Sequence, residues 1–273
     1  MTTSTRDNAD AARSSASQLQ QSAPFQAAAR TGFAVNGLLH IVIGVIALQV
    51  AFGGGGSADQ SGALANIAQE PFGRVVLWVV AVGLWSLGAF YLLDGALVRG
   101  TDRDDWGRRA KAFGKGVAYV VIGFTAATFA SGGSSDSSQQ STSLSAKLLA
   151  TPGGVALLVV LGLAVLAIGV YLVVKGIRRT FLDDIRRPPG GLGHATELVG
   201  AIGYVAKGVA IAVVGILFGA AAFTSDASKA KGLDGAVQAL AELPFGKVIL
   251  TAVALGLIAF GVYSFVRARY GRL

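Results

Sequence analysis

The sequence contains no cysteine and only two histidines, His40 and His194, among its 273 residues. The absence of cysteine excludes disulfides, thiolate metal sites and cysteine nucleophiles, and it leaves the redox compartment open. Two histidines leave little for a histidine-based metal centre. The apolar segments also lack a Ser/His/Asp set, a carboxylate pair and metal-ligand spacing. We therefore expect neither an enzyme nor a bound cofactor.

Charged residues are scarce as well: they make up 14% of the chain, against 53% hydrophobic residues and a mean hydropathy of +0.60. These values lie outside the range of ordinary soluble domains and indicate a protein that lies in a bilayer. The formal net charge of +8 would suggest nucleic acid binding if the cations formed one patch, but they form short clusters between apolar runs. We expect the lipid bilayer, and no nucleic acid, as a partner.

Six apolar runs are each long enough to cross the roughly 30 Å of a bilayer's hydrocarbon core as a helix. They cover residues 32–52, 74–97, 113–131, 153–175, 200–223 and 247–267. Lys and Arg concentrate before the first run, in the second and fourth loops, and after the last run. By the positive-inside rule, this predicts a multi-pass membrane protein with both termini in the cytoplasm. The first run lies too far from the start for an ordinary cleaved signal peptide.

The runs form three copies of a two-helix unit, and this repeat is the most specific signal in the sequence. The first helix of each unit carries a Gly-x6-Gly pair on one stripe, and the second begins near a Pro-x-Gly triplet with a further glycine at a fixed spacing. The repeated positions are Gly37, Gly44, Gly116, Gly123, Gly208 and Gly215 in the first helices, and Pro71, Gly73, Gly88, Pro152, Gly154, Gly169, Pro244, Gly246 and Gly261 in the second. We expect these small residues to let helices pack closely.

Each unit starts and ends on the same side of the membrane, so the copies are parallel repeats related by rotation about the membrane normal. This predicts an all-α, pseudo-threefold bundle of six transmembrane helices. Its predicted parts are a disordered cytoplasmic tail (1–27), repeat 1 (28–98), a cytoplasmic loop (99–112), repeat 2 (113–177), a second cytoplasmic loop (178–197) and repeat 3 (198–271).

Inside each unit the sequence predicts a short helix at the outer interface. Its N-cap residue is expected to be Ser61, Thr142 or Asp234 in the three copies. The Pro of the triplet ends this helix and is expected to lie in the first turn of the next span, where its missing N–H costs nothing.

The first helices read GLLHIVIG, GVAYVVIG and GVAIAVVG, and the second helices end in GAFYLLDG, GVYLVVKG and GVYSFVRA. With these motifs the chain resembles the actinobacterial integral membrane proteins catalogued as domain of unknown function 1206, over about residues 28–271. The resemblance implies a six-span plasma-membrane protein of three tandem units, and it implies no activity or catalytic residues. The second copy departs from the others by having Gly153 where Phe72 and Phe245 stand.

Two aligned columns of polar residues fall near the cytoplasmic ends of the spans. The columns are Asn36, Lys115 and Lys207, and Asp94, Lys175 and Arg267. The basic members are expected to extend toward the inner lipid head groups. Asp94 is the single acid, so we predict that it forms an ion pair with Lys115 or Lys207 and fixes the packing of the units. For His40 we expect a neutral ring that is hydrogen-bonded within the bundle.

These features favour a non-enzymatic structural or accessory membrane component, which could accompany another membrane protein. The alternative is a small-molecule transporter or channel along the pseudo-threefold axis. An axial cavity lined by Asn36, His40, Lys115 and Lys207 would favour transport, whereas an axis sealed by the glycine stripes would favour a structural role.

Overall fold

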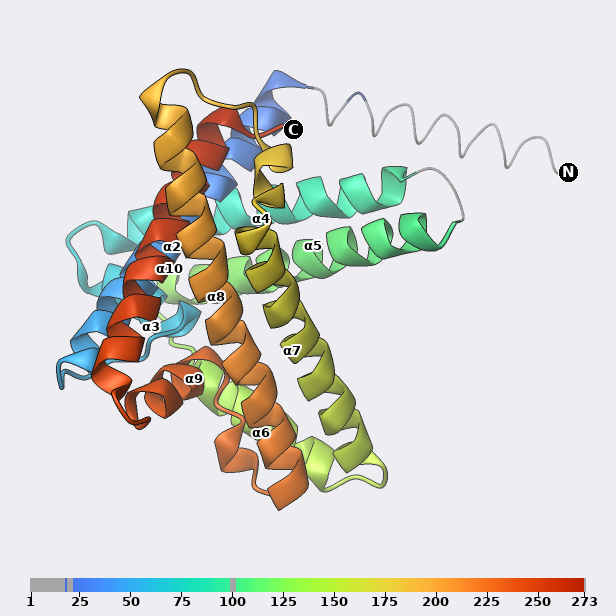
Figure 1. The fold of residues 1–273 in the computed structure, drawn as a ribbon, viewed down its shortest axis with the longest axis vertical. Coiled ribbons are helices and arrows are strands. Elements are labelled where there is room, and N and C mark those ends of the chain that lie inside the picture. The colour runs from blue at the N-terminus through green and yellow to red at the C-terminus, as the bar shows by residue number, and fades with distance from the viewer. Residues whose placement is uncertain (1–17, 19–21, 99–101, 273) are drawn as a thin grey trace, which may run out of the picture.

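The computed structural model describes residues 18, 22–98 and 102–272, which are almost entirely α-helical and contain no β-sheet (Figure 1). The helices are α2 (Ala23–Ala51), α3 (Gln60–Gln69), α4 (Gly73–Leu97), α5 (Arg103–Ala130), α6 (Ser137–Leu149), α7 (Gly154–Ile177), η1 (Thr180–Asp184), α8 (Gly191–Thr224), η2 (Ala227–Lys229), α9 (Gly232–Ala241) and α10 (Gly246–Tyr270). Six of them, namely α2, α4, α5, α7, α8 and α10, are long and apolar enough to cross a membrane. The predicted bundle of six spanning helices is confirmed.

Three long helices begin earlier than the sequence predicted. α2 begins at Ala23, inside the segment 1–27 that was expected to be disordered; residues 1–17 and 19–21 lie outside the described residues. α5 begins at Arg103 and α8 at Gly191, so both predicted cytoplasmic loops are partly helical. A proline lies at the start of α2 and two aspartates lie in the first turn of α5, and these residue types favour a helix start.

The long helices form three antiparallel pairs, and each pair joins two units. The second helix of one unit packs on the first helix of the next, giving α4 on α5, α7 on α8 and α10 on α2. The glycine stripes meet in these pairs. A Cβ added at Gly208 would lie 2.7 Å from the backbone oxygen of Gly169, and one at Gly37 would lie 2.7 Å from that of Gly261. Because α10 returns to α2, the three units form a closed cycle.

Repeat 2 breaks the threefold arrangement. Within repeat 1, α2 packs on α4, and within repeat 3, α8 packs on α10, whereas across the described residues α5 and α7 make at most a marginal contact. Figure 1 shows the α4–α5 pair running at a wide angle to the α7–α8 pair. As a result only 28% of the α5 span and 17% of the α7 span are buried, against 50% or more for α2, α4 and α10.

Each second helix begins in a sharp turn that requires a glycine. A Cβ at this first position would overlap a backbone oxygen of the preceding short helix; the three positions are Gly73, Gly154 and Gly246. The residue before each glycine has a left-handed backbone, with φ of 63°, 77° and 62° at Phe72, Gly153 and Phe245. The prolines stand one residue earlier still, so they precede the helix and do not lie in its first turn as predicted.

The short helices α3, α6 and α9 follow the long first helices, but their predicted N-caps are wrong. The Asp59 side chain caps α3 and the Asp136 side chain caps α6, while α9 begins after Lys231. Ser61 and Asp234 instead lie inside their helices and bond to other segments. The Ser61 hydroxyl accepts from the Ser137 N–H at 3.0 Å, and the Asp234 carboxylate accepts from the Ala58 N–H at 3.0 Å. The three outer segments are thereby joined.

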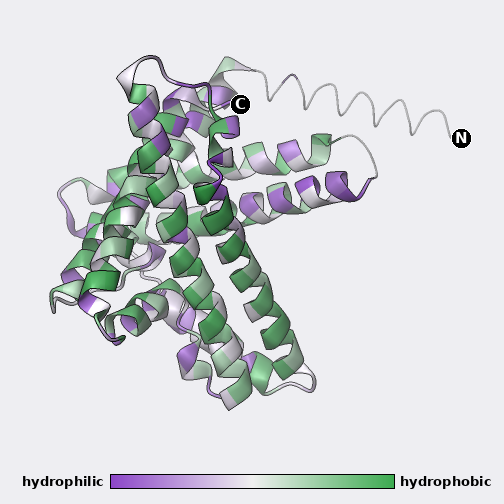
Figure 2. Ribbon diagram, in the orientation of Figure 1, coloured by the Kyte–Doolittle hydropathy of each residue, from purple (hydrophilic) through white to green (hydrophobic). Residues whose placement is uncertain are grey.

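The largest apolar cluster fills the space between the helix pairs on the side of the short helices α3 and α9. It includes the fully buried side chains Ile43, Leu64, Leu77, Val237 and Leu250, which come from α2, α3, α4, α9 and α10. Figure 2 shows that α7 and α8 are hydrophobic along most of their length, whereas the first turns of α5 are hydrophilic. The polar residues described next lie at the other end of this cluster.

Candidate functional site

Four basic side chains from four helices meet between the helix pairs. They are Lys115 of α5, Lys175 of α7, Lys207 of α8 and Arg267 of α10, and we call them the cationic cluster. The charges of Lys115 and Arg267 are close enough to repel that of Lys207. The side chains of Lys175 and Arg267 are only 10% and 18% exposed. The expectation that these residues extend outward to lipid head groups is therefore wrong for Lys175 and Arg267, which turn into the protein.

One carboxylate, Asp184 of η1, compensates part of this charge. Its Oδ2 lies 2.7 Å from Lys175 Nζ and 3.7 Å from Arg267 Nη2. Burial raises the pKa of the Asp184 carboxyl, but the charges of Arg267 and Lys175 outweigh burial and hold this pKa below its usual value. Asp184 is thus ionised at neutral pH. Among the described residues Asp184 is the one carboxylate within 4 Å of these four cations, and Asp94 attracts Lys115 from farther away, so the cluster keeps an excess of positive charge.

Asp184 is held in place by the burial of Phe181, at the start of the same short helix. The Phe181 ring is 0% exposed and stacks on Tyr204 with their centroids 5.1 Å apart. The Tyr263 hydroxyl donates to the Phe181 backbone oxygen at 3.0 Å. A Cβ at Gly200 would overlap the Phe181 ring, so a glycine on α8 makes room for it. This packing anchors η1 and directs Asp184 to the cations.

Aromatic rings contact the cations that have no carboxylate. Lys115 Nζ lies 5.0 Å from the centroid of the Tyr91 ring, and Lys207 Nζ lies 4.1 Å from that of Phe260. Arg267 Nη2 donates to the Tyr91 hydroxyl at 3.2 Å. In the part of the chain that the structure describes, no carboxylate lies within 4 Å of Lys115 or Lys207. Cation–π contacts stabilise a charge by about 0.5–2 kcal/mol, less than a buried carboxylate could.

Asn36 and His40, predicted to line an axial cavity with the two lysines, lie beside the cluster. Asn36 Nδ2 donates to Ser264 Oγ at 3.4 Å, and His40 Nδ1 lies 2.8 Å from the Asn36 backbone oxygen. The His40 and Phe260 rings are 4.7 Å apart, so His40 and Lys207 contact the same ring. The structure thus gathers these residues in one region, and a cavity between them stays a prediction.

Asp94 of α4 lies close enough to Lys115 for the two charges to attract each other. It is exposed on α4, and the ion pairs within 4 Å among the described residues do not include it. The ion pair of Asp94 with Lys115 or Lys207 therefore stays a prediction.

The three units correspond to a known family. The family described as Domain of Unknown Function (DUF1206) matches the chain over residues 31–97, 110–179 and 202–271. The chain belongs to this family. Each match covers one two-helix unit, so the predicted tandem repeat is confirmed. In this DUF1206 protein the cationic cluster draws Lys115 and Lys175 from the second match and Lys207 and Arg267 from the third.

One relative of this DUF1206 protein comes from a bacterium. The uncharacterized protein YxxB of Bacillus subtilis (strain 168) is 31% identical over 250 residues, which cover 88% of this chain and 89% of the relative. No solved structure matches the chain. An actinobacterial origin stays a prediction.

Sequence reasoning missed Asp184 and the aromatic partner Tyr204, whose ring lies 5.3 Å from Lys175 Nζ. Both lie outside the two aligned polar columns: Asp184 lies in η1, between α7 and α8, and Tyr204 lies three residues before Lys207 on α8. The available signal was the pair of acids, Asp183 and Asp184, in a loop otherwise rich in arginine. A lone acidic pair in a basic segment is a reason to look for internal ion pairing.

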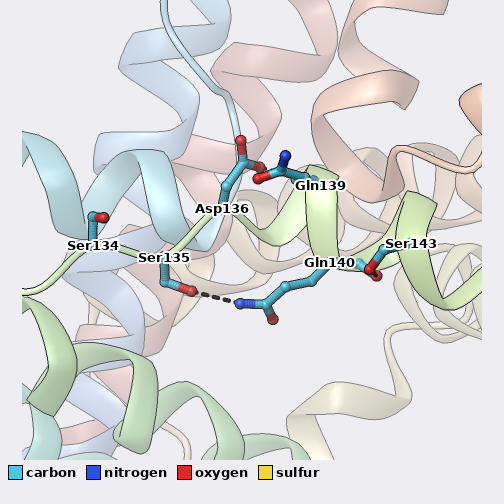
Figure 3. A pocket seen from close by; sticks show the side chains of 6 residues that line it. All are labelled: Ser134, Ser135, Asp136, Gln139, Gln140 and Ser143. Atoms are coloured by element: carbon cyan, nitrogen blue, oxygen red, sulfur yellow. Dashed lines mark hydrogen bonds between the residues drawn. The ribbon is translucent and has the colours of Figure 1, made fainter.

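The surface of the described residues also has two hollows. The first, of about 490 Å³, lies before and along the start of α6 and is lined by Ser134, Ser135, Asp136, Gln139, Gln140 and Ser143 (Figure 3). Gln140 Nε2 donates to Ser135 Oγ across it at 2.8 Å. The second, of about 470 Å³, lies on apolar surfaces of α7, α8 and α10. Residues of the cationic cluster line neither hollow.

Proposed function

We propose that this protein is a non-enzymatic structural or accessory component of a bacterial plasma membrane, with both termini in the cytoplasm. The observation that carries the proposal is the packing between the helix pairs toward the outer helices. Ile43, Leu77 and Leu250 are each 0% exposed there, and the pairs approach closely at glycines. A solute path needs a hydrated or polar lining, so a filled apolar interior supports a structural role over transport.

The uncovered apolar faces of α5 and α7 support binding of another membrane protein. Val121 and Phe124 of α5 are 57% and 62% exposed, and Val160 and Leu163 of α7 are 60% and 59% exposed. In lipid, helices associate through shape and small-residue packing, and a splayed pair of spans offers a surface for such packing.

The test is purification of the full chain from its native host in mild detergent, followed by mass spectrometry. A stoichiometric membrane partner is expected, and Val160→Phe with Leu163→Phe should reduce its recovery by changing the shape of the α7 face. Val248→Phe, at an exposed position of α10, is the matched control and should leave recovery unchanged. Recovery of the chain alone would contradict the proposal.

Transport of a small anion is the second candidate, and the observation that favours it is the excess positive charge of the cationic cluster. Uptake of labelled inorganic anions by proteoliposomes separates the two functions. A structural component leaves uptake at the level of empty vesicles. Uptake that depends on Lys207 would replace the structural proposal.

A further inference from the structure

The cationic cluster contains more positive charge than the surrounding protein neutralises. Asp184 is already engaged by Lys175 and Arg267. Lys115 and Lys207 rest on aromatic rings, and no carboxylate of the described residues lies within 4 Å of them. A charge that is partly removed from water is costly unless it is paired and hydrogen-bonded, and among these two lysines this applies to the partly buried Lys207. An anion from outside the protein would therefore stabilise this arrangement.

We propose that the cationic cluster binds a phosphoryl group, with Lys115, Lys207 and Arg267 as its basic ligands. Lysine ammonium groups act as point charges toward phosphate, while the planar arginine fork donates two parallel hydrogen bonds. Arg267 uses one N–H on the Tyr91 hydroxyl and keeps further donors. The positive charge that remains suits a phosphate, which carries one to two negative charges at neutral pH.

The sparse contact between α5 and α7 provides access. Lys111 Nζ lies 4.7 Å from the ring of Tyr171 on α7, so the stripe of α5 that includes Lys115, one turn later, faces α7. Lys115 itself is exposed. Phe113 and Val117 of α5 and Val170 of α7 are exposed beside it. A phosphate could arrive there as the head group of an anionic phospholipid, with its acyl chains on these apolar side chains, or as a soluble phosphate compound from the cytoplasm.

The test uses the full-length protein in mild detergent and does not depend on the proposed structural role. Phosphatidylglycerol and phosphatidylcholine are the lipid probes, and inorganic phosphate against chloride at equal ionic strength is the soluble probe. Thermal unfolding and native mass spectrometry report binding. We expect a phosphate-bearing probe to raise the Tm of the wild type. The double variant Lys115→Met with Lys207→Met should bind at least tenfold more weakly.

Lys247→Met is the matched control, because Lys247 is an exposed lysine at the far end of α10 that rests on Phe52. It should bind as the wild type does. Stabilisation by phosphatidylglycerol alone assigns the site to a lipid head group, and stabilisation by inorganic phosphate with the same lysine dependence assigns it to a soluble phosphate.

The proposal is overturned if the lipid probe and the soluble probe each raise the Tm of the double variant as much as that of the wild type. It is also overturned if Lys247→Met weakens binding as much as the double variant does. If the double variant does not fold, the single variant Lys115→Met serves, since this side chain is exposed. Its binding should weaken at least threefold, and unchanged binding would overturn the proposal.

Discussion

Asp184 comes from a loop with four arginines, yet it contacts a lysine of α7 and an arginine of α10. Because these two helices belong to different units, one carboxylate connects repeats 2 and 3 near the C-terminal ends of α7 and α10. Removal of one member of a buried ion pair leaves the other charge uncompensated. The stability of the cluster should therefore depend on Asp184 more than on any neighbouring acid.

We predict that Asp184→Asn lowers the free energy of unfolding by about 1–3 kcal/mol at neutral pH. Asp183→Asn, at the exposed neighbouring acid, is the control and should change it by less than about 0.5 kcal/mol. Denaturant unfolding of the purified variants measures both. Equal stabilities for Asp184→Asn and the wild type would contradict the role given to this ion pair.

The same carboxyl predicts a pH dependence. Its pKa is lower in the folded protein than its ordinary value of about 3.9, so its contribution to stability is present above that value and is lost as pH falls through the lower folded pKa. The stability difference between wild type and Asp184→Asn should thus be constant from pH 7 to about 5 and shrink below about 4. A difference that stays constant down to pH 3 would contradict a lowered pKa of the Asp184 carboxyl in the fold.

At the scale of helices, glycines on the same helix differ in how closely a neighbouring helix approaches them. Gly208 lies against the backbone of α7, with the backbone N of Val173 only 2.6 Å from the place of an added Cβ, while Gly219 on the same helix has no atom within 4 Å of it. Gly215 and Gly219 form a G-x-x-x-G on α8, and of these two only Gly215 lies where an added Cβ would overlap another helix.

We predict that Gly208→Ala destabilises the protein by about 1–3 kcal/mol, because the methyl group must push α7 away from α8. Gly219→Ala, the matched control on α8, should be neutral or stabilising by up to about 1 kcal/mol, since alanine favours a helix. Thermal unfolding in detergent compares the two. A loss of the same size in both variants would point to a general intolerance of α8.

The outer caps make a second comparison of elements. Asp59 is 2% exposed, caps α3 and also lies 3.4 Å from the Ser138 hydroxyl of α6, whereas Asp136 is exposed and caps α6 alone. We predict that Asp59→Ala lowers the free energy of unfolding by about 1–2 kcal/mol and that Asp136→Ala lowers it by less. Only the first change also removes a hydrogen bond to α6. Chemical denaturation ranks them, and the reverse order would contradict this reading.

The six helices, the three repeats and the packing glycines could be predicted, because span length and repeated spacing are written directly in the sequence. The helix on which each glycine stripe packs could not be predicted. The spacing of Gly37 and Gly208 is the same whether they face a helix of their own unit or of the next unit. The splaying of α5 from α7 was equally hidden, because repeat 2 reads like the other two. The sequence showed the four cations of the cationic cluster only as members of two aligned columns. That they meet inside the protein could not be predicted, because Asp184 and Tyr204, which contact them there, lie outside those columns.

At the scale of the whole molecule, the distribution of charge predicts orientation. Lys and Arg concentrate in the second and fourth loops and near the termini, while the segment between α2 and α4 carries none from Gly53 to Phe72. Cytoplasmic loops carry the excess of Lys and Arg in membrane proteins. The chain offers a direct test, because it has no cysteine and any introduced thiol is therefore unique.

We predict that Ser134→Cys, beside the hollow before α6, reacts with a membrane-impermeant maleimide added to intact cells. Pro189→Cys, in the fourth loop, should react only after the membrane is permeabilised. Both positions are exposed, so a difference in labelling reports sidedness and not burial. The cysteine-free wild type is the blank. If only Pro189→Cys were labelled in intact cells, the topology would be the reverse of the predicted one and the cationic cluster would lie toward the outer leaflet. The predicted labelling pattern places the cluster where phosphate compounds of the cytoplasm and lipids of the inner leaflet reach it.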